Sequence, residues 1–303
     1  MRTKFIFYLL IAFSNIVYGQ KTDKKLEKEL IAISHSFHGD LGIYFKDLKT
    51  NKIIAINADS VFPTASMVKI PILLGIVDKI NKGELNYHQP VIYKDSLLYE
   101  GVDILGSFKT GEKIEISKLM MLMMTMSDNT ASLWLQSLSG GGLRVNELLD
   151  SIGFTNTRIN SRTKGREDNR TIYGWGQTSP REMATLMEKI YKKELINEAA
   201  SDRMLRSMNK NYWDSESLSQ IPISVNVFSK NGAVNRSRSE VLLVNAPHGD
   251  YVFCVITKNN VDQSWEKNNE AWELIRKISL TIWRHQEKKS NWQPNTEGLK
   301  KWF

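Results

Sequence analysis

The chain has 303 residues, 41% of them hydrophobic, and a formal net charge of +8. A chain of this length and hydrophobic content can bury a large core, in one domain or in two interlocked domains. The basic residues are scattered, without a basic stripe or a nucleic-acid-binding motif, so net charge is the only feature pointing to a nucleic-acid partner. The single cysteine, Cys254, excludes an intrachain disulfide and lies in an apolar run typical of a core. The five histidines have no metal-ligand spacing beyond His35 and His38, which the pattern places at the surface, and no cofactor is indicated.

Residues 1–19 have the features of a signal peptide. Arg2 and Lys4 precede an apolar stretch at 5–17, and a small-residue cleavage site follows at 17–19, before Gln20. The alternative is an N-terminal membrane anchor, but the stretch is short for a spanning helix and includes polar residues. No later stretch is long and apolar enough to span a bilayer, and no cysteine at the cleavage site could accept a lipid. We therefore expect an exported protein without a stable membrane span after cleavage.

The remaining elements follow in chain order. An amphipathic helix is predicted at 22–37, and two strands at 41–45 and 53–56 flank a polar turn. From residue 66 to about 216 the pattern is mostly helical. In this region Ser179 and Glu182 form a predicted capping box, with Pro180 at the first helical position. Strand patterns return, a long helix follows, and the chain ends in a polar tail; the predicted ranges are 225–229, 241–244, 251–257, 263–286 and 290–303.

Strands at both ends with helices between them indicate an α+β fold, because one sheet must then be assembled from distant segments. The predicted sheet domain is discontinuous, comprising residues 20–60 and 218–289. Residues 61–217 form a helical domain packed beside it.

Three short motifs occur in a fixed order along this framework. They are Ser66-Met67-Val68-Lys69, Ser127-Asp128-Asn129 and Lys230-Asn231-Gly232. The pattern S-x-x-K occurs four times in the chain, and Ser66 is singled out because a loop leads straight into an apolar helix there. Residues three apart lie on one helix face, so the Lys69 side chain can reach the Ser66 hydroxyl. Burial can lower the pKa of this lysine towards the range of a general base.

Together the motifs resemble the S-x-x-K, S-D-N and K-T-G signatures of class A β-lactamases and penicillin-binding proteins, with Asn231 where Thr or Ser usually stands. The resemblance covers roughly residues 40 to 285. It implies an antiparallel sheet flanked by terminal helices, plus an inserted all-helical domain, with the active site in the cleft between them. It also implies an exported bacterial serine hydrolase, periplasmic or secreted, that opens the β-lactam amide through a Ser66 acyl-enzyme.

The family resemblance also implies roles for individual residues. Ser66 would be the nucleophile and Lys69 its base, while Ser127 would relay a proton to the leaving group. Asp128 would fix its loop by accepting backbone N–H groups. The oxyanion would be bound by the N–H groups of Ser66 and Ala233. The second positive group near the substrate carboxylate would be Arg236 or Arg238. The substrate-binding residues implied are Asn129, Lys230, Asn231, Gly232, Ala233 and Arg236.

Two departures concern deacylation. The family's catalytic glutamate stands in an E-x-x-L-N pattern; here Glu167 is the first candidate and Asp168 the second, and neither is followed by that pattern. Leu133 stands where the family usually has the Asn that steadies the glutamate loop. Acylation needs a nucleophile, a base and an oxyanion hole, whereas turnover also needs an activated water.

Three functions therefore remain open. β-Lactam hydrolysis is the first prediction. The second is a D-alanyl-D-alanine carboxypeptidase, or another serine amidase or esterase, with slow or no β-lactam turnover. The third is a non-catalytic binder of peptidoglycan or β-lactams. The expected small-molecule partner is a β-lactam or a peptidoglycan-like substrate, and we expect a monomer.

Overall fold

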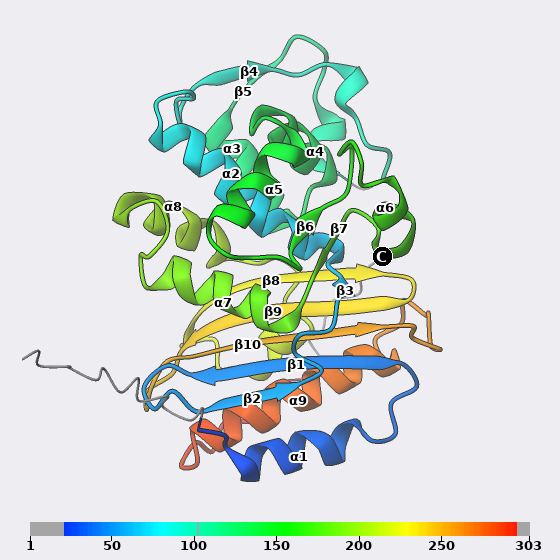
Figure 1. The fold of residues 1–303 in the computed structure, drawn as a ribbon, viewed down its shortest axis with the longest axis vertical. Coiled ribbons are helices and arrows are strands. Elements are labelled where there is room, and N and C mark those ends of the chain that lie inside the picture. Colours follow the sequence, from blue (N-terminus) through cyan, green and yellow to red (C-terminus); the bar gives the residue numbers. More distant parts are fainter. Residues whose placement is uncertain (1–20, 102, 296–303) are drawn as a thin grey trace, which may run out of the picture.

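The computed structural model describes residues 21–101 and 103–295, so the predicted signal peptide lies outside the described residues. A five-stranded sheet in the order β2-β1-β10-β9-β8 crosses the middle of the molecule, and all its neighbours pair antiparallel (Figure 1). The sheet joins the two ends of the chain, as the sequence predicted. Its strands are β1 (Asp40–Asp47), β2 (Ile53–Ile56), β8 (Asn226–Val234), β9 (Ser237–Asn245) and β10 (Tyr251–Lys258).

Two terminal helices, α1 (Lys24–Ser34) and α9 (Glu270–Gln286), cover one face of the sheet (Figure 1). Their apolar residues form a core with that face, which includes Leu30 and Ile278. The long helix was predicted from residue 263, but this start is wrong. The side chain of Asn269 caps α9 by accepting the N–H groups of Ala271 and Trp272, so the helix begins at Glu270.

The other face of the sheet packs against the segment between its strands (Figure 1). This segment is mostly helical, as predicted, and the nearly all-apolar α2 lies buried at its centre. Its helices are α2 (Lys69–Asn81), α3 (Ile116–Met121), α4 (Asn129–Leu138), α5 (Gly141–Ser151), α6 (Glu167–Tyr173), α7 (Pro180–Tyr191) and α8 (Glu198–Met208). Shorter 3₁₀ turns are η1 (Ala65–Val68), η2 (Asp95–Leu97), η3 (Ile104–Ser107) and η5 (Ser217–Gln220), and η4 (Leu122–Met126) is a π-helical turn.

An all-helical domain was expected here, but the segment also contains two small sheets. One pairs β4 (Pro90–Ile92) with β5 (Lys113–Glu115), and the other has the order β3-β7-β6. The second sheet comprises β3 (Phe62–Pro63), β6 (Arg158–Ile159) and β7 (Gly176–Thr178). It ties the loop at 160–175 to the chain that leads into Ser66. No helix among the described residues is long and apolar enough to cross a membrane.

The start of α7 differs in one respect from the predicted capping box. The Ser179 hydroxyl accepts the Glu182 N–H at 3.3 Å, and Pro180 is at the first helical position, as expected. The Glu182 carboxylate does not return to the Ser179 N–H. It accepts the backbone N–H groups of Asn156 at 2.9 Å and Thr157 at 2.6 Å, so it fastens the chain leading into β6.

Candidate active site

The Ser66 turn stands at the junction of the sheet and the helical segment. Ser66 lies on η1, directly before α2. The preceding Ala65 has φ 44°, in the left-handed region that a residue with a Cβ rarely adopts. The turn is held on both sides, because Thr64 donates its N–H to the Gly176 carbonyl at 2.9 Å and accepts the N–H of Met67 at 3.1 Å. Such strain persists only where the surroundings impose it, which is common at functional sites.

Lys69 joins the first two motifs. Its side chain is fully buried, and its Nζ lies 3.2 Å from Ser66 Oγ, 3.0 Å from Ser127 Oγ and 2.9 Å from Asn129 Oδ1. It also donates to the Ser127 carbonyl oxygen. Burial lowers the pKa of Lys69 from 10.5 to about 7, although the negative charges of Asp103 and Asp128 oppose this shift. Near neutral pH a substantial fraction of the lysine is therefore the free amine, which can take a proton from Ser66.

Two carboxylates, those of Asp128 and Asp103, fix the Ser127 loop by accepting hydrogen bonds. Ser127 has φ 60° and follows the π-helical turn η4. Asp128 accepts the N–H of Ala131 at 2.7 Å and that of Leu105 at 3.1 Å, the loop-fixing role expected for it. Asp103 adds a second brace, because it accepts both the N–H and the hydroxyl of Thr130, at 2.7 and 3.0 Å. No sequence pattern pointed to Asp103, because its position depends on a contact across 27 residues.

The third motif lies within β8 and not after it. The ladder with β9 runs from Asn226–Asn245 to Val234–Ser237, so all of Lys230-Asn231-Gly232 is paired. A Cβ on Gly232 would lie 2.7 Å from Ser66 N, 2.7 Å from Thr64 O and 2.9 Å from Ser239 Oγ. The absence of a side chain therefore lets β8 press directly against the Ser66 turn.

Lys230 and Asn231 are both turned into the protein. Lys230 is fully buried, and its Nζ donates to the carbonyl and the side-chain oxygen of Asn231, at 2.9 and 3.1 Å. Asn231 is 1% exposed, and its amide nitrogen donates to the Trp213 carbonyl at 3.2 Å. Burial lowers the pKa of Lys230 well below its usual range, and the charge of Lys69 lowers it further, whereas Glu240 and Glu216 raise it. The structure thus directs the Asn231 side chain towards protein partners.

A cavity of about 580 Å³ opens in front of Ser66. Of the predicted residues, Ser66, Asn129, Ala233 and Arg236 line it. No aspartate or glutamate is among the described residues that line it. Unpredicted lining residues are Pro63, Ala65, Tyr99, Ile172, Tyr173, Gly174, Trp175, Val234, Ser237, Lys258 and Asn259.

The cavity walls are partly aromatic and partly cationic. The rings of Tyr99 and Trp175 meet edge to face, with centroids 5.0 Å apart. Lys258 Nζ donates to the Val61 carbonyl at 2.9 Å and lies 4.8 Å from the Phe62 ring centroid. The apolar run at 251–257 predicts a strand that ends just before Lys258, but it does not reveal that this strand end reaches the cavity.

The two arginine candidates are distinguished by their surroundings. Arg236 is exposed in the β8–β9 turn and lines the cavity. Arg238 is fully buried, and its guanidinium lies 4.7 Å from the Trp265 ring centroid and 4.5 Å from that of Trp272. Of the two arginines, only Arg236 is among the described residues that line the cavity.

Glu167 is not among the described residues that line the cavity, although Ile172 and Tyr173 of the same helix are. It is the first residue of α6, and its carboxylate accepts the Gly165 N–H at 3.1 Å. The second candidate, Asp168, is exposed. Leu133 is buried in the core, with 3% of its surface exposed.

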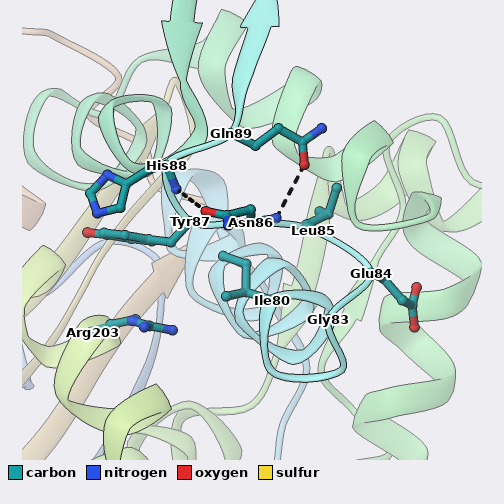
Figure 2. A pocket seen from close by; sticks show the side chains of 9 residues that line it. All are labelled: Ile80, Gly83, Glu84, Leu85, Asn86, Tyr87, His88, Gln89 and Arg203. Atoms are coloured by element: carbon teal, nitrogen blue, oxygen red, sulfur yellow. Dashed lines mark hydrogen bonds between the residues drawn. The ribbon is translucent and has the colours of Figure 1, made fainter.

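A second hollow, of about 520 Å³, lies where α2 ends and α8 passes (Figure 2). Arg203 and Tyr87 both line this hollow, and the Arg203 guanidinium lies 5.1 Å from the Tyr87 ring centroid. The Nδ1 of His88 lies 3.0 Å from the Glu115 carboxylate. None of the lining residues shown is a serine, threonine or cysteine, so this hollow offers no counterpart to Ser66.

Known proteins resemble the chain over most of its length. The sequence model of the Beta-lactamase enzyme family matches residues 25–286. Beta-lactamase VEB-1 of Pseudomonas aeruginosa is 23% identical over 295 residues, covering 93% of this chain and 97% of that protein. The solved structure of PBP-A has a TM-score of 0.78 at 24% identity and covers 89% of this chain and 98% of its own. A β-lactamase structure from Chitinophaga pinensis has a TM-score of 0.77 at 20% identity, covering 86% and 99%.

The two structural likenesses confirm the predicted α+β fold, and the family match has a direct consequence for identity. It spans the sheet, the helical segment and all three motifs, so the chain belongs to the β-lactamase enzyme family, a family of hydrolases.

Proposed function

We propose that this protein is an exported serine hydrolase that opens the β-lactam amide through a Ser66 acyl-enzyme and releases the acyl group slowly. One observation carries the proposal: a buried lysine lies within hydrogen-bonding distance of both Ser66 Oγ and Ser127 Oγ, beside a cavity without a carboxylate among its described lining residues.

The acylation half-reaction follows from these contacts. Neutral Lys69 takes the proton of the Ser66 hydroxyl, and Oγ attacks the β-lactam carbonyl carbon. The oxyanion that forms would be bound by the N–H groups of Ser66 and Ala233. When the carbon–nitrogen bond breaks, the ring nitrogen receives a proton through Ser127, which regains one from Lys69. The product is an ester on Ser66.

Hydrolysis of that ester needs an activated water. A carboxylate normally supplies the base in this chemistry, yet Glu167 lies outside the cavity lining and is bonded to its own loop. We therefore expect the ester to persist. A mutant of PBP-A, 25% identical to this chain, has been solved as an acyl-enzyme complex with penicillin G. An acyl-enzyme of this kind has therefore been observed in a related protein.

The charge of the cavity indicates an anionic substrate. Arg236 and Lys258 line it, and Lys230 lies fully buried in β8 beside the Ser66 turn. A β-lactam carboxylate fits this field, as does the C-terminal carboxylate of a peptidoglycan-like peptide. A carboxypeptidase would use the same acylation half-reaction. Its acyl donor would be a peptidoglycan-like peptide in place of a β-lactam.

The test is to mix residues 20–303 with a chromogenic cephalosporin and follow both colour and intact mass. The expected result is one equivalent of rapid colour release with an adduct mapped to Ser66, followed by slow turnover. Ser66→Ala should abolish both signals, whereas the matched change Ser151→Ala, at an exposed helix end, should abolish neither. Absence of both adduct and turnover in the unmodified protein would refute the proposal. Fast turnover without an adduct would refute the slow release.

A further inference from the structure

A cluster of buried polar side chains lies behind the third motif. We name it the Glu216 cluster, and its members are at most 9% exposed: Asn211, Glu216, Lys230, Asn231 and Glu240. Buried charges are costly unless they are paired and hydrogen-bonded, so such a group needs a structural explanation. The proposed acylation chemistry does not use these carboxylates.

Asn231 is the bridge of the cluster. Its Oδ1 accepts from Lys230 Nζ at 3.1 Å and from Asn211 Nδ2 at 3.3 Å. Its Nδ2 donates to Glu216 Oε2 at 3.4 Å and to the Trp213 carbonyl at 3.2 Å. An amide offers two donor hydrogens and a separate acceptor oxygen, whereas a hydroxyl offers one donor hydrogen. A Thr or Ser at this position could not link the lysine and both acceptors at once.

Glu240 completes the cluster from the neighbouring strand. It stands directly opposite Asn231 in the β8–β9 ladder. Its Oε2 accepts the Ser217 N–H at 2.7 Å, so the segment that carries Glu216 also holds Glu240. Its Oε1 has no hydrogen-bond partner among the described residues. Two carboxylates thus lie near one buried ammonium, which they favour in its charged form.

We propose that Asn231, Glu216 and Glu240 are positioning residues that hold Lys230 as a fixed cation behind the cavity. On this proposal Asn231 acts through the cluster and does not bind substrate. The substitution of Asn for the family's Thr or Ser and the two glutamates then form one coordinated arrangement. The proposal rests on Ser66 acylation for its catalytic readout, but the charge of Lys230 can be measured without any substrate.

Other charged groups also face the cluster and enter its titration. Lys69 on α2 disfavours the charge on Lys230. Arg238 on β9 and Arg276 on α9 interact favourably with Glu216. Burial and the charge of Glu216 both raise the pKa of Glu240, and on β10 the charge of Glu240 adds to burial in raising the pKa of Cys254. Because the pKa of Glu240 is raised to about 8, its negative charge is present mainly above that pH, so its effect should appear on the alkaline limb of the pH profile.

The first measurement is the titration of Lys230 by NMR in protein with isotope-labelled lysine, assigned with Lys230→Gln. Glu240→Gln and Glu216→Gln should each lower its pKa, as expected for loss of a nearby opposite charge. Glu188→Gln is the matched control, because Glu188 is also buried but pairs with Lys46 and Lys192. An unchanged Lys230 pKa in both cluster variants would overturn the proposal, whatever the enzyme does with substrate.

The second measurement is the pH dependence of Ser66 acylation by the chromogenic cephalosporin. The alkaline limb should move to lower pH by about the same amount in Glu240→Gln and not in the Glu188 control. Asn231→Thr should slow acylation about tenfold, and by clearly less when Glu216 is already Gln, because the two residues act as a unit. If Asn231→Thr instead weakens substrate binding equally in both backgrounds, Asn231 is a substrate ligand and the proposal is wrong. A shifted Lys230 pKa without any Ser66 adduct would support the cluster and refute the proposed function.

Discussion

Replacing Gly232 with Ala is the most direct test of how β8 meets the Ser66 turn. The added Cβ would fall 2.7 Å from Ser66 N and 2.7 Å from Thr64 O, well inside contact distance. Both are backbone atoms, so no side chain can rotate away to relieve them. The turn cannot yield easily either, because Ala65 is already at φ 44° and Thr64 is tied to Gly176.

Two effects follow, and each has a magnitude. Forcing one methyl group into a packed site costs about 1–3 kcal/mol of unfolding free energy. For a protein of this size that is a fall in Tm of about 2–4 °C for each kcal/mol. The same displacement would move the Ser66 N–H from the oxyanion position proposed for it, and loss of one such donor costs about 100-fold to 1000-fold in rate. Acylation should therefore fall far more than stability.

The assay is the rate of adduct formation on Ser66, followed by rapid-quench mass spectrometry beside a thermal melt. Gly106→Ala is the matched control, because a Cβ there meets only Leu98 Cδ1 at 3.4 Å, an ordinary contact. The control should acylate within about threefold of the unmodified protein. If Gly232→Ala also acylates within about threefold, β8 does not position the oxyanion donor, and the reasoning fails.

Three further predictions concern the base, the loop and the deacylation step. The acylation rate should rise with pH through about 7, because burial lowers the pKa of Lys69 to about 7 and only the neutral amine accepts a proton; a rate that falls across this range would contradict this. Asp128→Ala should lower the free energy of unfolding, measured in urea, by about 2–4 kcal/mol, because it removes the α4 cap and leaves the Leu105 N–H unpaired. The control Asp168→Ala, at an exposed position, should lower it by less than about 0.5 kcal/mol. Glu167→Gln should change the decay of the acyl-enzyme by less than about threefold, measured by intact mass; a tenfold slower decay would identify Glu167 as the base.

The parts of the site that the sequence predicted share one property: they depend on local spacing. Ser66 and Lys69 are three residues apart, and a helical turn brings their side chains together. Asp128 caps the helix that follows it directly. The buried sheet strands were predicted for the same reason, because each carries its own apolar pattern. Their boundaries were less accurate, since the ends are set by ladder partners such as Ser237 for Val234.

The residues that the sequence could not predict depend on contacts between distant segments. Asp103 reaches Thr130 across 27 residues, and Lys258 reaches Val61 across 197. Tyr99 and Trp175 meet from two loops that carry no periodic pattern. Glu240 faces Asn231 only because the β8–β9 register pairs them. In each case the residue type is ordinary, and only the register or loop path gives it a place at the site.

The same distinction separates the two halves of the proposed reaction. Acylation uses Ser66, Lys69 and Ser127, which are held together by hydrogen bonds of Lys69 and by the Asp128 brace of the Ser127 loop. Deacylation depends on a loop, here 160–175, whose path is fixed by β6 and β7 at its two ends. A loop of that kind can lose its base without disturbing the fold or the first step. Retaining the first step while losing the second would convert a hydrolase into a slow-releasing acyl-enzyme, and this is why adduct lifetime is the decisive quantity to measure here.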